Sequence, residues 1–386
     1  MAIQSLAMGG AEKFFTNLAS SLSERHEVTC YIPALGCGDP MIIRRLQSIP
    51  VVSIPLFNNF GYKMFYKLTL MLQRHFPQAD PEAAWHDRNL RALHRKHRFD
   101  IVNSQLMEGT RQVCRAFEHV SLPITESDHG DFSMVDPARL LQNAVIFRRL
   151  DALICPSQAN VEKANVYPWR PDIRLPMIPY GYMGSPGNST EATQRGPAFT
   201  FGLVARGVVE KGWEEAVAAG RLLRKRGSKP FRLLFVGAGP CLERLERDIS
   251  AEDRSWIEFA GQQENPEDWI RRFDVGLLPS HLLGESLPNT IIEYLACGKA
   301  VIATAIGGVP EMVANAGRLI PLAGNGRADI RALAQEMQLM LDDVALRDSL
   351  VASTGEAFSK YSMQRCVAAY EQVFEEMRGR SAFLAS

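Results

Sequence analysis

No run of about 18 uncharged apolar residues occurs in this sequence, and a helix needs about that length to cross a bilayer. A basic segment followed by a hydrophobic one, the pattern of a secretory signal, is also missing. The seven cysteines are scattered and form no C-x-x-C pair, which argues against a disulfide framework and against a zinc site. We therefore expect a cytoplasmic protein in a reducing compartment.

An excess of charge is missing as well, because 43 Lys and Arg residues balance 43 Asp and Glu residues. Proteins that bind nucleic acid usually carry a basic excess, so we expect no nucleic-acid partner and only local anion sites. No D-x-D carboxylate pair occurs, although metals that neutralise a diphosphate are commonly held by carboxylates. We expect no metal and no cofactor.

The composition that is present, 46% hydrophobic and 22% charged residues in a chain of 386, is that of a globular protein. Strand and helix patterns alternate throughout, which predicts parallel sheets covered by helices on both faces. The strands expected in the first half are Ala2–Leu6, Val28–Ile32, Val51–Ile54, Ile101–Asn103, Pro123–Glu126 and Ala152–Cys155. Those expected in the second half are Phe199–Val204, Leu233–Val236, Trp256–Ala260, Val275–Leu278, Ala300–Thr304 and Gly317–Ile320.

The segment 182–197 is rich in Gly, Ser, Thr and Pro and predicts a linker. We therefore expect an α/β protein of two tandem Rossmann-like, doubly wound domains, 1–181 and 198–360, whose strand ends face a shared cleft. Helices are expected over Val344–Lys360 and Ser362–Met377, the second within a C-terminal segment, 361–386. Between Leu56 and Arg98 the pattern is helical, basic and aromatic. It fits core helices with a solvated basic face, or else an acceptor groove or a membrane-surface contact.

Two features of the first half could form a binding site. Gly9 and Gly10 follow the first expected strand, where paired glycines make a tight turn or let a ligand approach the backbone and a helix N-terminus. His129 follows the Pro123–Glu126 strand, so it is expected at the carboxyl edge of the sheet. A lone histidine there is either structural or catalytic.

In the second half, Arg206 and Lys211 lie five residues apart in a loop between a strand and a helix. Two cations at the carboxyl end of a strand can close on a diphosphate, although a solvated basic turn is the alternative. The turn after Leu233–Val236 reads G-A-G-P and includes Gly239. It matches the dinucleotide fingerprint poorly, because the third glycine and the acidic residue about 20 positions on are missing, so nicotinamide chemistry is disfavoured.

The segment Pro279–Glu311 carries two carboxylates, Glu285 and Glu293, with seven residues between them. Pro288 predicts a helix start and Gly298 a helix end, so Glu293 lies within a helix among apolar residues. A ribose diol would satisfy such a buried carboxylate, and Glu285 in the preceding loop can face another hydroxylated ring. An ion pair with Lys299 or an arginine is the alternative.

These motifs, in this order, resemble the family 4 retaining glycosyltransferases, which have the GT-B fold. The resemblance rests on GGAE near the start, R-x4-KG, GAGP, E-x7-E, ACGKAVIAT and GGVPE, and it extends over nearly the whole chain.

The resemblance implies a role for each matching residue. Gly9 and Gly10 would approach the donor diphosphate, Arg206 and Lys211 would hold it, and His129 would lie near the anomeric centre. Glu285 would contact the transferred sugar and Glu293 the ribose. Three further groups of residues are implied to bind substrate. Gly239 lies in the GAGP turn, and Gly261, Gln262 and Gln263 would lie near the nucleobase. The loop residues Ser286, Leu287, Pro288 and Asn289 would bind through the backbone N–H groups of this segment.

The implied function is a hexosyltransferase of polysaccharide biosynthesis. It would move a sugar, without metal and with retention, from a nucleotide-diphosphate donor, UDP-sugar favoured over GDP-sugar, to a hydroxyl of a glycan or lipid-linked glycan. The alternatives are a non-hydrolysing nucleotide-sugar epimerase and a degenerate nucleotide-sugar-binding subunit. The last helix would cross back to the first domain, and contact with the inner face of the membrane is possible for the basic, aromatic stretch.

Overall fold

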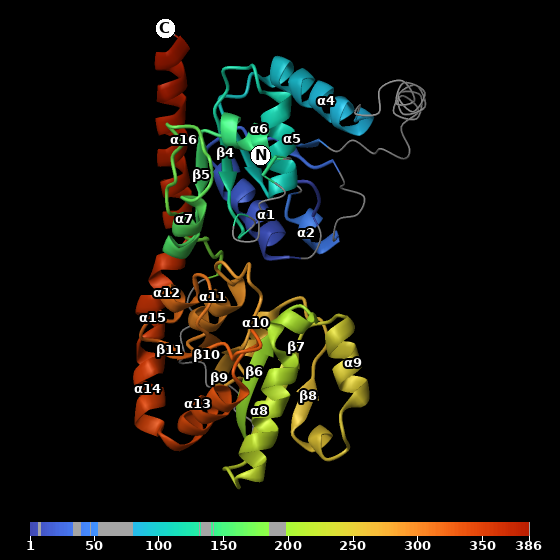
Figure 1. Cartoon of the computed structure of the whole chain (residues 1–386), viewed down its shortest axis with the longest axis vertical. Coiled ribbons are helices and arrows are strands. Elements are labelled where there is room, and N and C mark those ends of the chain that lie inside the picture. The colour runs from blue at the N-terminus through green and yellow to red at the C-terminus, as the bar shows by residue number, and fades with distance from the viewer. Residues whose placement is uncertain are drawn as a thin grey trace. The chain divides into compact units, whose positions relative to one another are not determined.

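The protein is described by a computed structural model over residues 1–6, 9–33, 40–46, 48–52, 80–130, 132, 140–141, 143–184 and 198–385. The chain forms two compact units (Figure 1). Unit 1 comprises Met1–Gly181 and Met363–Ser386, and unit 2 comprises Tyr182–Ser362. Most of the expected linker and of the basic, aromatic stretch before residue 80 lies outside the described residues.

Unit 1 contains a parallel sheet in two parts, β1–β2 and β3–β4–β5. Its strands are β1 (Cys30–Tyr31), β2 (Val51–Val52), β3 (Val102–Gln105), β4 (Ile124–Ser127) and β5 (Ala152–Ile154). Ala2 forms isolated parallel bridges to both Tyr31 and Ser104, and so joins the two parts. The expected strand Ala2–Leu6 is therefore wrong in extent. Its backbone is shared between two neighbours, with Ala2 N donating to Asn103 O and Ile3 N to Tyr31 O.

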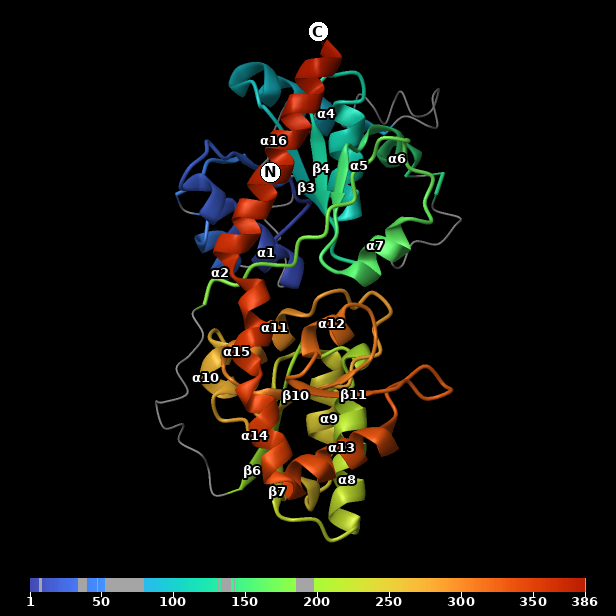
Figure 2. The same cartoon turned by 90° about the vertical axis from the view of Figure 1, so that its left-hand side faces the viewer.

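Helices surround the sheet of unit 1. They are α1 (Gly10–Ser23), α2 (Pro40–Arg44), α4 (Pro81–His97), α5 (Met107–Ala116), α6 (Ala144–Arg149), α7 (Gln158–Ala164) and α16 (Met363–Ala385). The last of these contacts α1 and extends along unit 1 (Figure 2). It continues beyond the expected end at Met377, because a single glycine, Gly379, weakens a helix without breaking it.

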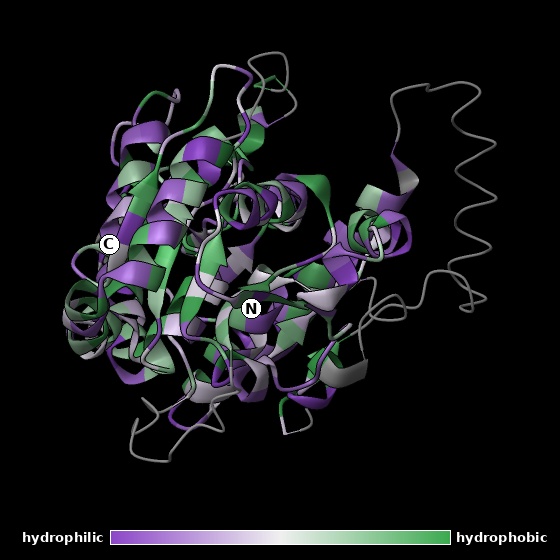
Figure 3. Ribbon diagram, turned by 90° about the horizontal axis from the view of Figure 1, so that it is seen from below, coloured by the Kyte–Doolittle hydropathy of each residue, from purple (hydrophilic) through white to green (hydrophobic). Residues whose placement is uncertain are grey.

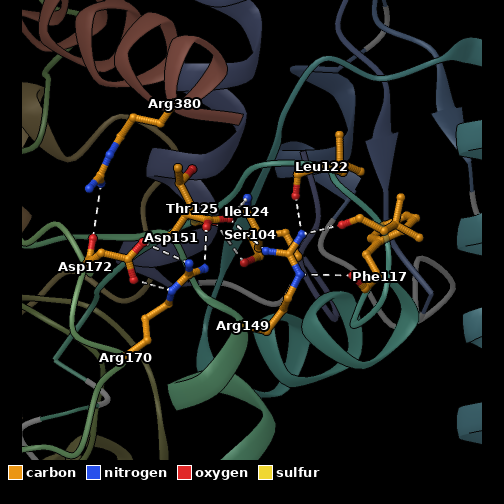
Figure 4. Close-up of polar contacts among 11 residues, drawn as sticks. Ser104, Phe117, Leu122, Ile124, Thr125, Arg149, Asp151, Arg170, Asp172 and Arg380 are labelled. Carbon is orange, nitrogen blue, oxygen red and sulfur yellow. Dashed lines mark hydrogen bonds and ion pairs between the residues drawn. The ribbon is translucent and has the colours of Figure 1, made fainter. Parts of the chain in front are cut away.

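A charged cluster fastens the amino ends of β4 and β5 (Figure 4). The Asp151 carboxylate accepts hydrogen bonds from Ile124 N at 2.8 Å, Arg149 Nη1 at 2.8 Å and Arg170 Nη1 at 2.7 Å. The same Arg149 guanidinium donates to the carbonyl oxygens of Phe117, Val120 and Leu122. One arginine thus ties the last turn of α6 to the chain that enters β4.

Unit 2 contains a parallel sheet in the order β11-β10-β9-β6-β7-β8. Its strands are β6 (Phe199–Val204), β7 (Phe231–Val236), β8 (Ile257–Phe259), β9 (Val275–Leu278), β10 (Ala300–Thr304) and β11 (Gly317–Ile320). The helices are α8 (Trp213–Lys225), α9 (Pro240–Asp248), α10 (Pro266–Ile270), α11 (Asn289–Ala296), α12 (Val309–Val313), α13 (Ile330–Asp342), α14 (Val344–Ala352) and α15 (Thr354–Phe358). Apolar residues of the strands and helices form the core of this unit. In the ribbon coloured by hydropathy, the helices carry both hydrophilic and hydrophobic residues (Figure 3).

In unit 2, one helical prediction needs correction and one helix was not predicted. The helix expected over Val344–Lys360 is divided into α14, α15 and a short 3-10 turn, Ser359–Tyr361. The break falls at Ser353, whose hydroxyl donates back to Ser349 O. Helix α12 was missed, because it is a single turn that opens at Val309 directly after two glycines.

The strand order of unit 2 reverses at β6, with β7 on one side and β9 on the other. In such sheets the loops at the carboxyl ends of the strands beside the reversal diverge and leave a crevice where ligands bind. The loops in question are the one that carries Arg206 and Lys211 after β6 and the one that carries Glu285 after β9. The fold therefore places the two predicted charged loops at the same edge of one sheet.

Candidate functional site

The loop after β6 is held by the helix that follows it. Trp213 is fully buried at the start of α8, and its indole Nε1 donates to Arg206 O at 3.0 Å. A 3-10 turn, Val209–Lys211, brings the chain to Gly212, whose φ of 79° is in the left-handed region. A Cβ at Gly212 would lie 2.0 Å from Pro279 O, so glycine is required both by conformation and by space.

The side chains of the two predicted cations have different surroundings. Arg206 is exposed, whereas only 9% of Lys211 is exposed. The Lys211 ammonium donates from Nζ to Glu285 Oε2 at 2.6 Å, and Glu285 is itself 7% exposed. A solvated basic turn is therefore the wrong interpretation for Lys211, which forms a buried ion pair across 74 residues of sequence.

The carboxylate of Glu285 has a second donor. Ser280 Oγ lies 2.7 Å from Glu285 Oε2, and Ser280 is 1% exposed. The backbone is fixed as well, because Glu285 N donates to Leu282 O at 2.9 Å and Gly308 N to Ser286 O at 2.9 Å. A Cβ at Gly307, which has a φ of 52°, would lie 1.6 Å from Glu285 O. The loop after β10 therefore packs directly against the predicted site.

Helix α11 carries the second carboxylate. Pro288 is its N-cap residue, and the proline ring accepts no hydrogen bond from the first N–H groups of the helix. Glu293 is 5% exposed in the middle of the helix. Burial, the hydrogen bond to Glu267 and the charge of Glu293 together raise the pKa of Tyr182.

The GAGP turn supports the Arg206 loop. Gly207 N donates to Ala238 O at 2.7 Å, and Cys241 N, at the start of α9, donates to Gly207 O at 2.8 Å. A Cβ at Gly239 would lie 2.9 Å from the carbonyl oxygen of Gly207, so any larger residue would press on this backbone. Backbone packing therefore accounts for Gly239, and its role in substrate binding stays a prediction.

The predicted nucleobase segment follows β8. Gly261 has a φ of 68°, and its carbonyl oxygen accepts a hydrogen bond from Gly237 N at 2.9 Å. Gln263 Nε2 donates to Ala260 O at 2.5 Å, and Gln262 beside it is exposed. The segment is thus an ordered turn that lies against the GAGP turn.

The glycine pair of unit 1 opens helix α1. Gly9 is the N-cap residue with an extended backbone, Gly10 is the first helical residue, and no side chain caps the helix. A Cβ at Gly9 would lie 2.3 Å from Glu12 Oε2, which is the far end of a flexible side chain. The space above this helix start is therefore limited by Glu12 rather than by backbone.

His129 lies among aromatic rings of unit 1. Its ring stacks on Tyr180 with centroids 5.1 Å apart and meets Phe14 edge-on at 5.8 Å. Burial lowers the pKa of His129 to about 3, so the imidazole is neutral at pH 7. Its Nε2 lies 2.9 Å from Gln105 Oε1, so the ring and this amide are within hydrogen-bond distance.

Ser280 and Gln105 are contacts of the site that sequence reasoning missed. Ser280 follows Pro279 directly after β9, and Gln105 is the last residue of β3. A polar residue at the end of a strand is a signal that could have identified each of them from the sequence.

Across the residues that the structure describes, no group of three His, Cys, Asp or Glu side chains could hold a metal ion. Within the same residues, no helix is long and apolar enough to span a membrane.

Solved structures define the class of fold. The chain superposes on HepE of Anabaena, solved in complex with UDP, with a TM-score of 0.75 and 16% identity over 97% of this chain and 99% of that one. A glycosyltransferase of Rickettsia africae gives a TM-score of 0.75 and 17% identity over 97% of both chains. These neighbours are GT-B proteins with two Rossmann-like domains, and the predicted α/β fold of this class is confirmed.

Two family models match the sequence, and together they cover most of it. The model of group 1 glycosyl transferases matches residues 198–343, and that of glycosyltransferase family 4 matches residues 8–181. The chain belongs to the family 4, group 1 glycosyltransferases, as the motif resemblance predicts.

Curated relatives match over shorter stretches. N-acetyl-alpha-D-glucosaminyl L-malate synthase of Bacillus anthracis is 28% identical over 38% of this chain and 38% of the relative. The putative colanic acid biosynthesis glycosyltransferase WcaL of Escherichia coli is 33% identical over 37% of each. Each alignment thus spans well under half of the relative's length.

Proposed function

We propose that this protein is a glycosyltransferase that moves a sugar from a UDP-sugar to a hydroxyl group of a glycan or lipid-linked glycan. The observation that carries the proposal is the buried Lys211–Glu285 pair at the carboxyl edge of the unit 2 sheet, beside the reversal of strand order. A buried ion pair gives little net stability, so its position at the carboxyl edge of the sheet favours a functional role. The UDP bound by HepE supports a UDP-linked donor.

Each residue of the pair has capacity left for substrate. Among the described residues, Lys211 uses one of its three ammonium donors, so the other two can bind the diphosphate together with the exposed Arg206. Among the described residues, nothing donates to Glu285 Oε1, which can accept a hydrogen bond from a sugar hydroxyl. The N–H groups at the start of α11 can meet a phosphate, and Glu293 within that helix can bind the ribose diol.

We propose that transfer occurs with retention and without a metal. Because its pKa is about 3, the imidazole of His129 is a weak base at pH 7, and it serves better as a hydrogen-bond partner of the sugar. The bond from the anomeric carbon to the leaving phosphate breaks, and the acceptor oxygen bonds to the same face of that carbon. The leaving phosphate oxygen takes the acceptor proton, and the two cations stabilise the charge on the diphosphate.

The test uses variants that keep volume and remove charge. Lys211→Met and Glu285→Gln should each reduce sugar transfer at least about a hundredfold, because each removes one electrostatic contact to the donor. Lys229→Met is the matched control, since Lys229 forms a solvent-exposed pair with Asp342 at 3.3 Å in the same unit. Thermal-shift screening against UDP-, GDP-, ADP- and TDP-sugars identifies the donor, because a ligand that binds the folded state raises its melting temperature.

Two results would replace the proposal. Epimerisation of UDP-N-acetylglucosamine without any acceptor would make the protein an epimerase. Tight donor binding with neither transfer nor slow donor hydrolysis would make it a binding subunit. Unchanged transfer in both charge-removal variants would exclude the assigned site.

We further propose a peripheral contact with the cytoplasmic face of an anionic membrane through α4. Arg88, Arg91 and Arg95 are exposed along one side of this helix at spacings of three and four residues. Such a row of cations suits acidic headgroups. Co-sedimentation with vesicles that contain phosphatidylglycerol should fall when Arg88 and Arg95 are changed to Gln. Equal binding of the variant, or no preference over neutral vesicles, would contradict the contact.

A further inference from the structure

Ser280 lies between the two charged loops of unit 2. It follows β9 and Pro279, and it is 1% exposed. Its Oγ lies 2.7 Å from Glu285 Oε2 and 3.1 Å from Glu210 O, and it accepts a hydrogen bond from Leu282 N at 3.3 Å. The hydroxyl therefore contacts the Arg206–Lys211 loop, its own loop and the candidate sugar-binding carboxylate together.

A serine hydroxyl has one proton and can donate it to one acceptor at a time. The carboxylate of Glu285 is charged, whereas Glu210 O is a neutral carbonyl, and hydrogen bonds to charged acceptors are shorter and stronger. The shorter distance is the one to Glu285. The proton therefore lies toward Glu285 Oε2, where it adds to the bond from Lys211 Nζ.

We propose that Ser280 is a positioning residue that fixes the Glu285 carboxylate for the donor sugar. With both donors on Oε2, rotation of the carboxylate is restrained, and Oε1 is the oxygen presented to a sugar hydroxyl. The backbone bond from His281 N to Glu210 O, at 2.8 Å, joins the two loops so that Ser280 keeps its place. This inference rests on the proposed function, because it names which part of the donor the residue controls.

A second serine in unit 2 provides a matched control. Ser250 Oγ donates to Asp253 Oδ2 at 2.7 Å, and it accepts a hydrogen bond from Asp253 N at 3.1 Å. Asp253 is 7% exposed and pairs with Arg221 at 2.8 Å, so it also has an ion-pair partner and a serine donor. This cluster precedes β8, at the opposite edge of the sheet from the loops that follow the strands. Loss of either hydroxyl removes the same kind of bond, but only one lies at the proposed site.

The first experiment needs no ligand. Crystal structures of the free wild-type protein, Ser280→Ala and Ser250→Ala should show that the Glu285 carboxylate rotates or splits into two positions only in Ser280→Ala. A carboxylate that stays on Lys211 with Oε1 in the same place would overturn the positioning role. Ser280→Cys, whose thiol is slightly larger and donates more weakly, should displace the carboxylate to a smaller extent and serves if the alanine variant does not fold.

The second experiment compares UDP with UDP-glucose by calorimetry. Ser280→Ala should bind UDP-glucose about tenfold more weakly than the wild type, while its affinity for UDP stays within about twofold, since only the sugar contact is lost. Ser250→Ala should leave both affinities unchanged. Equal weakening of UDP and UDP-glucose would show a general loop effect and overturn the inference. If the wild type binds neither compound, the proposed donor class fails, and the crystal structures still decide the role of Ser280.

Discussion

The two units build parallel sheets from different kinds of residue. In unit 1, strands β3 and β4 have the sequences Val-Asn-Ser-Gln and Ile-Thr-Glu-Ser, yet every one of these residues is buried. In unit 2, strands β9 and β10 read Val-Gly-Leu-Leu and Ala-Val-Ile-Ala-Thr and are equally buried. The same architecture is thus filled by polar side chains in one unit and by apolar ones in the other.

Hydrogen bonds make the polar interior of unit 1 possible. Asn103 Nδ2 lies 3.1 Å from Thr125 Oγ1 and 3.2 Å from Ser127 Oγ, which bridges neighbouring strands. Tyr370 on α16 donates from its hydroxyl to Ser127 Oγ at 2.8 Å. A buried polar group that lost its partner would destabilise the fold, so unit 1 depends on particular pairs. In unit 2, strands β9 and β10 rely instead on apolar area, and the Lys211–Glu285 pair lies in the loops beyond the strand ends.

The largest expected effect tests the apolar side of this comparison. Leu233 on β7 is fully buried in the core of unit 2, and Leu233→Ala should destabilise that unit by about 4 kcal/mol through lost burial and a cavity. Hydrogen exchange, measured by peptide, should rise in unit 2 alone. Leu233→Met keeps the volume and is the control. An equal rise in unit 1 would mean that the units do not open separately.

The next effect tests the polar side. Asp151→Asn removes the charge between Arg149 and Arg170, and should destabilise unit 1 by about 3 kcal/mol because two partly buried arginines lose their shared acceptor. Glu118→Gln breaks only the more exposed pair with Arg148 and should change stability by about 0.5 kcal/mol or less. Hydrogen exchange of β4 and β5 peptides gives the measurement. Similar values for the two variants would contradict the importance of the cluster.

Acid should weaken unit 1 through its buried histidines. Burial first, and then the charge of Arg115, lower the pKa of His86 to about 4, and burial lowers that of His129 to about 3. The unfolded chain binds a proton at each near pH 6.5, so their stabilising effect is complete above that pH. It is lost as the pH falls from about 6.5 toward 4 for His86 and toward 3 for His129. The loss reaches about 2 kcal/mol per histidine at pH 5.

Hydrogen exchange at pH 7 and pH 5, corrected for intrinsic rates, checks this prediction. The loss should be confined to unit 1, and His86→Gln should reduce it, because a side chain that does not titrate replaces the one bonded to Tyr31 at 2.6 Å. A pH-independent stability of unit 1 in the wild type would contradict the assignment of neutral, buried histidines.

The smallest effect concerns the bond between α16 and the sheet. Tyr370→Phe removes one buried hydroxyl and should destabilise unit 1 by about 1 kcal/mol, since Ser127 loses a partner but keeps its bond to Asn103. Faster exchange in α16 and β4 peptides is expected, with unit 2 unchanged. No change in either peptide would show that the contact of α16 rests on its apolar face alone.

The same contrast explains where sequence reasoning succeeded. In unit 2, β6, β9, β10 and β11 have the bounds that their apolar runs predict, because those runs are delimited by polar or glycine turns. In unit 1, β3 begins and ends later than expected, and Ala2–Leu6 reduces to bridges at Ala2. Buried Asn, Ser and Thr residues do not form the apolar run that predicts a buried strand. The bounds of these strands could therefore not be read from the sequence.

By itself, the sequence determined the fold class and the order of the motifs, because strand, turn and helix signals are local. It also singled out Lys211 and Glu285 as charged residues at strand ends. Only the tertiary structure decided that they form a pair, since the reversal of strand order at β6 brings together loops 74 residues apart. Their contact with Ser280 and the neutral state of His129 were decided in the same way. Burial and hydrogen-bond partners depend on neighbours that are distant along the chain.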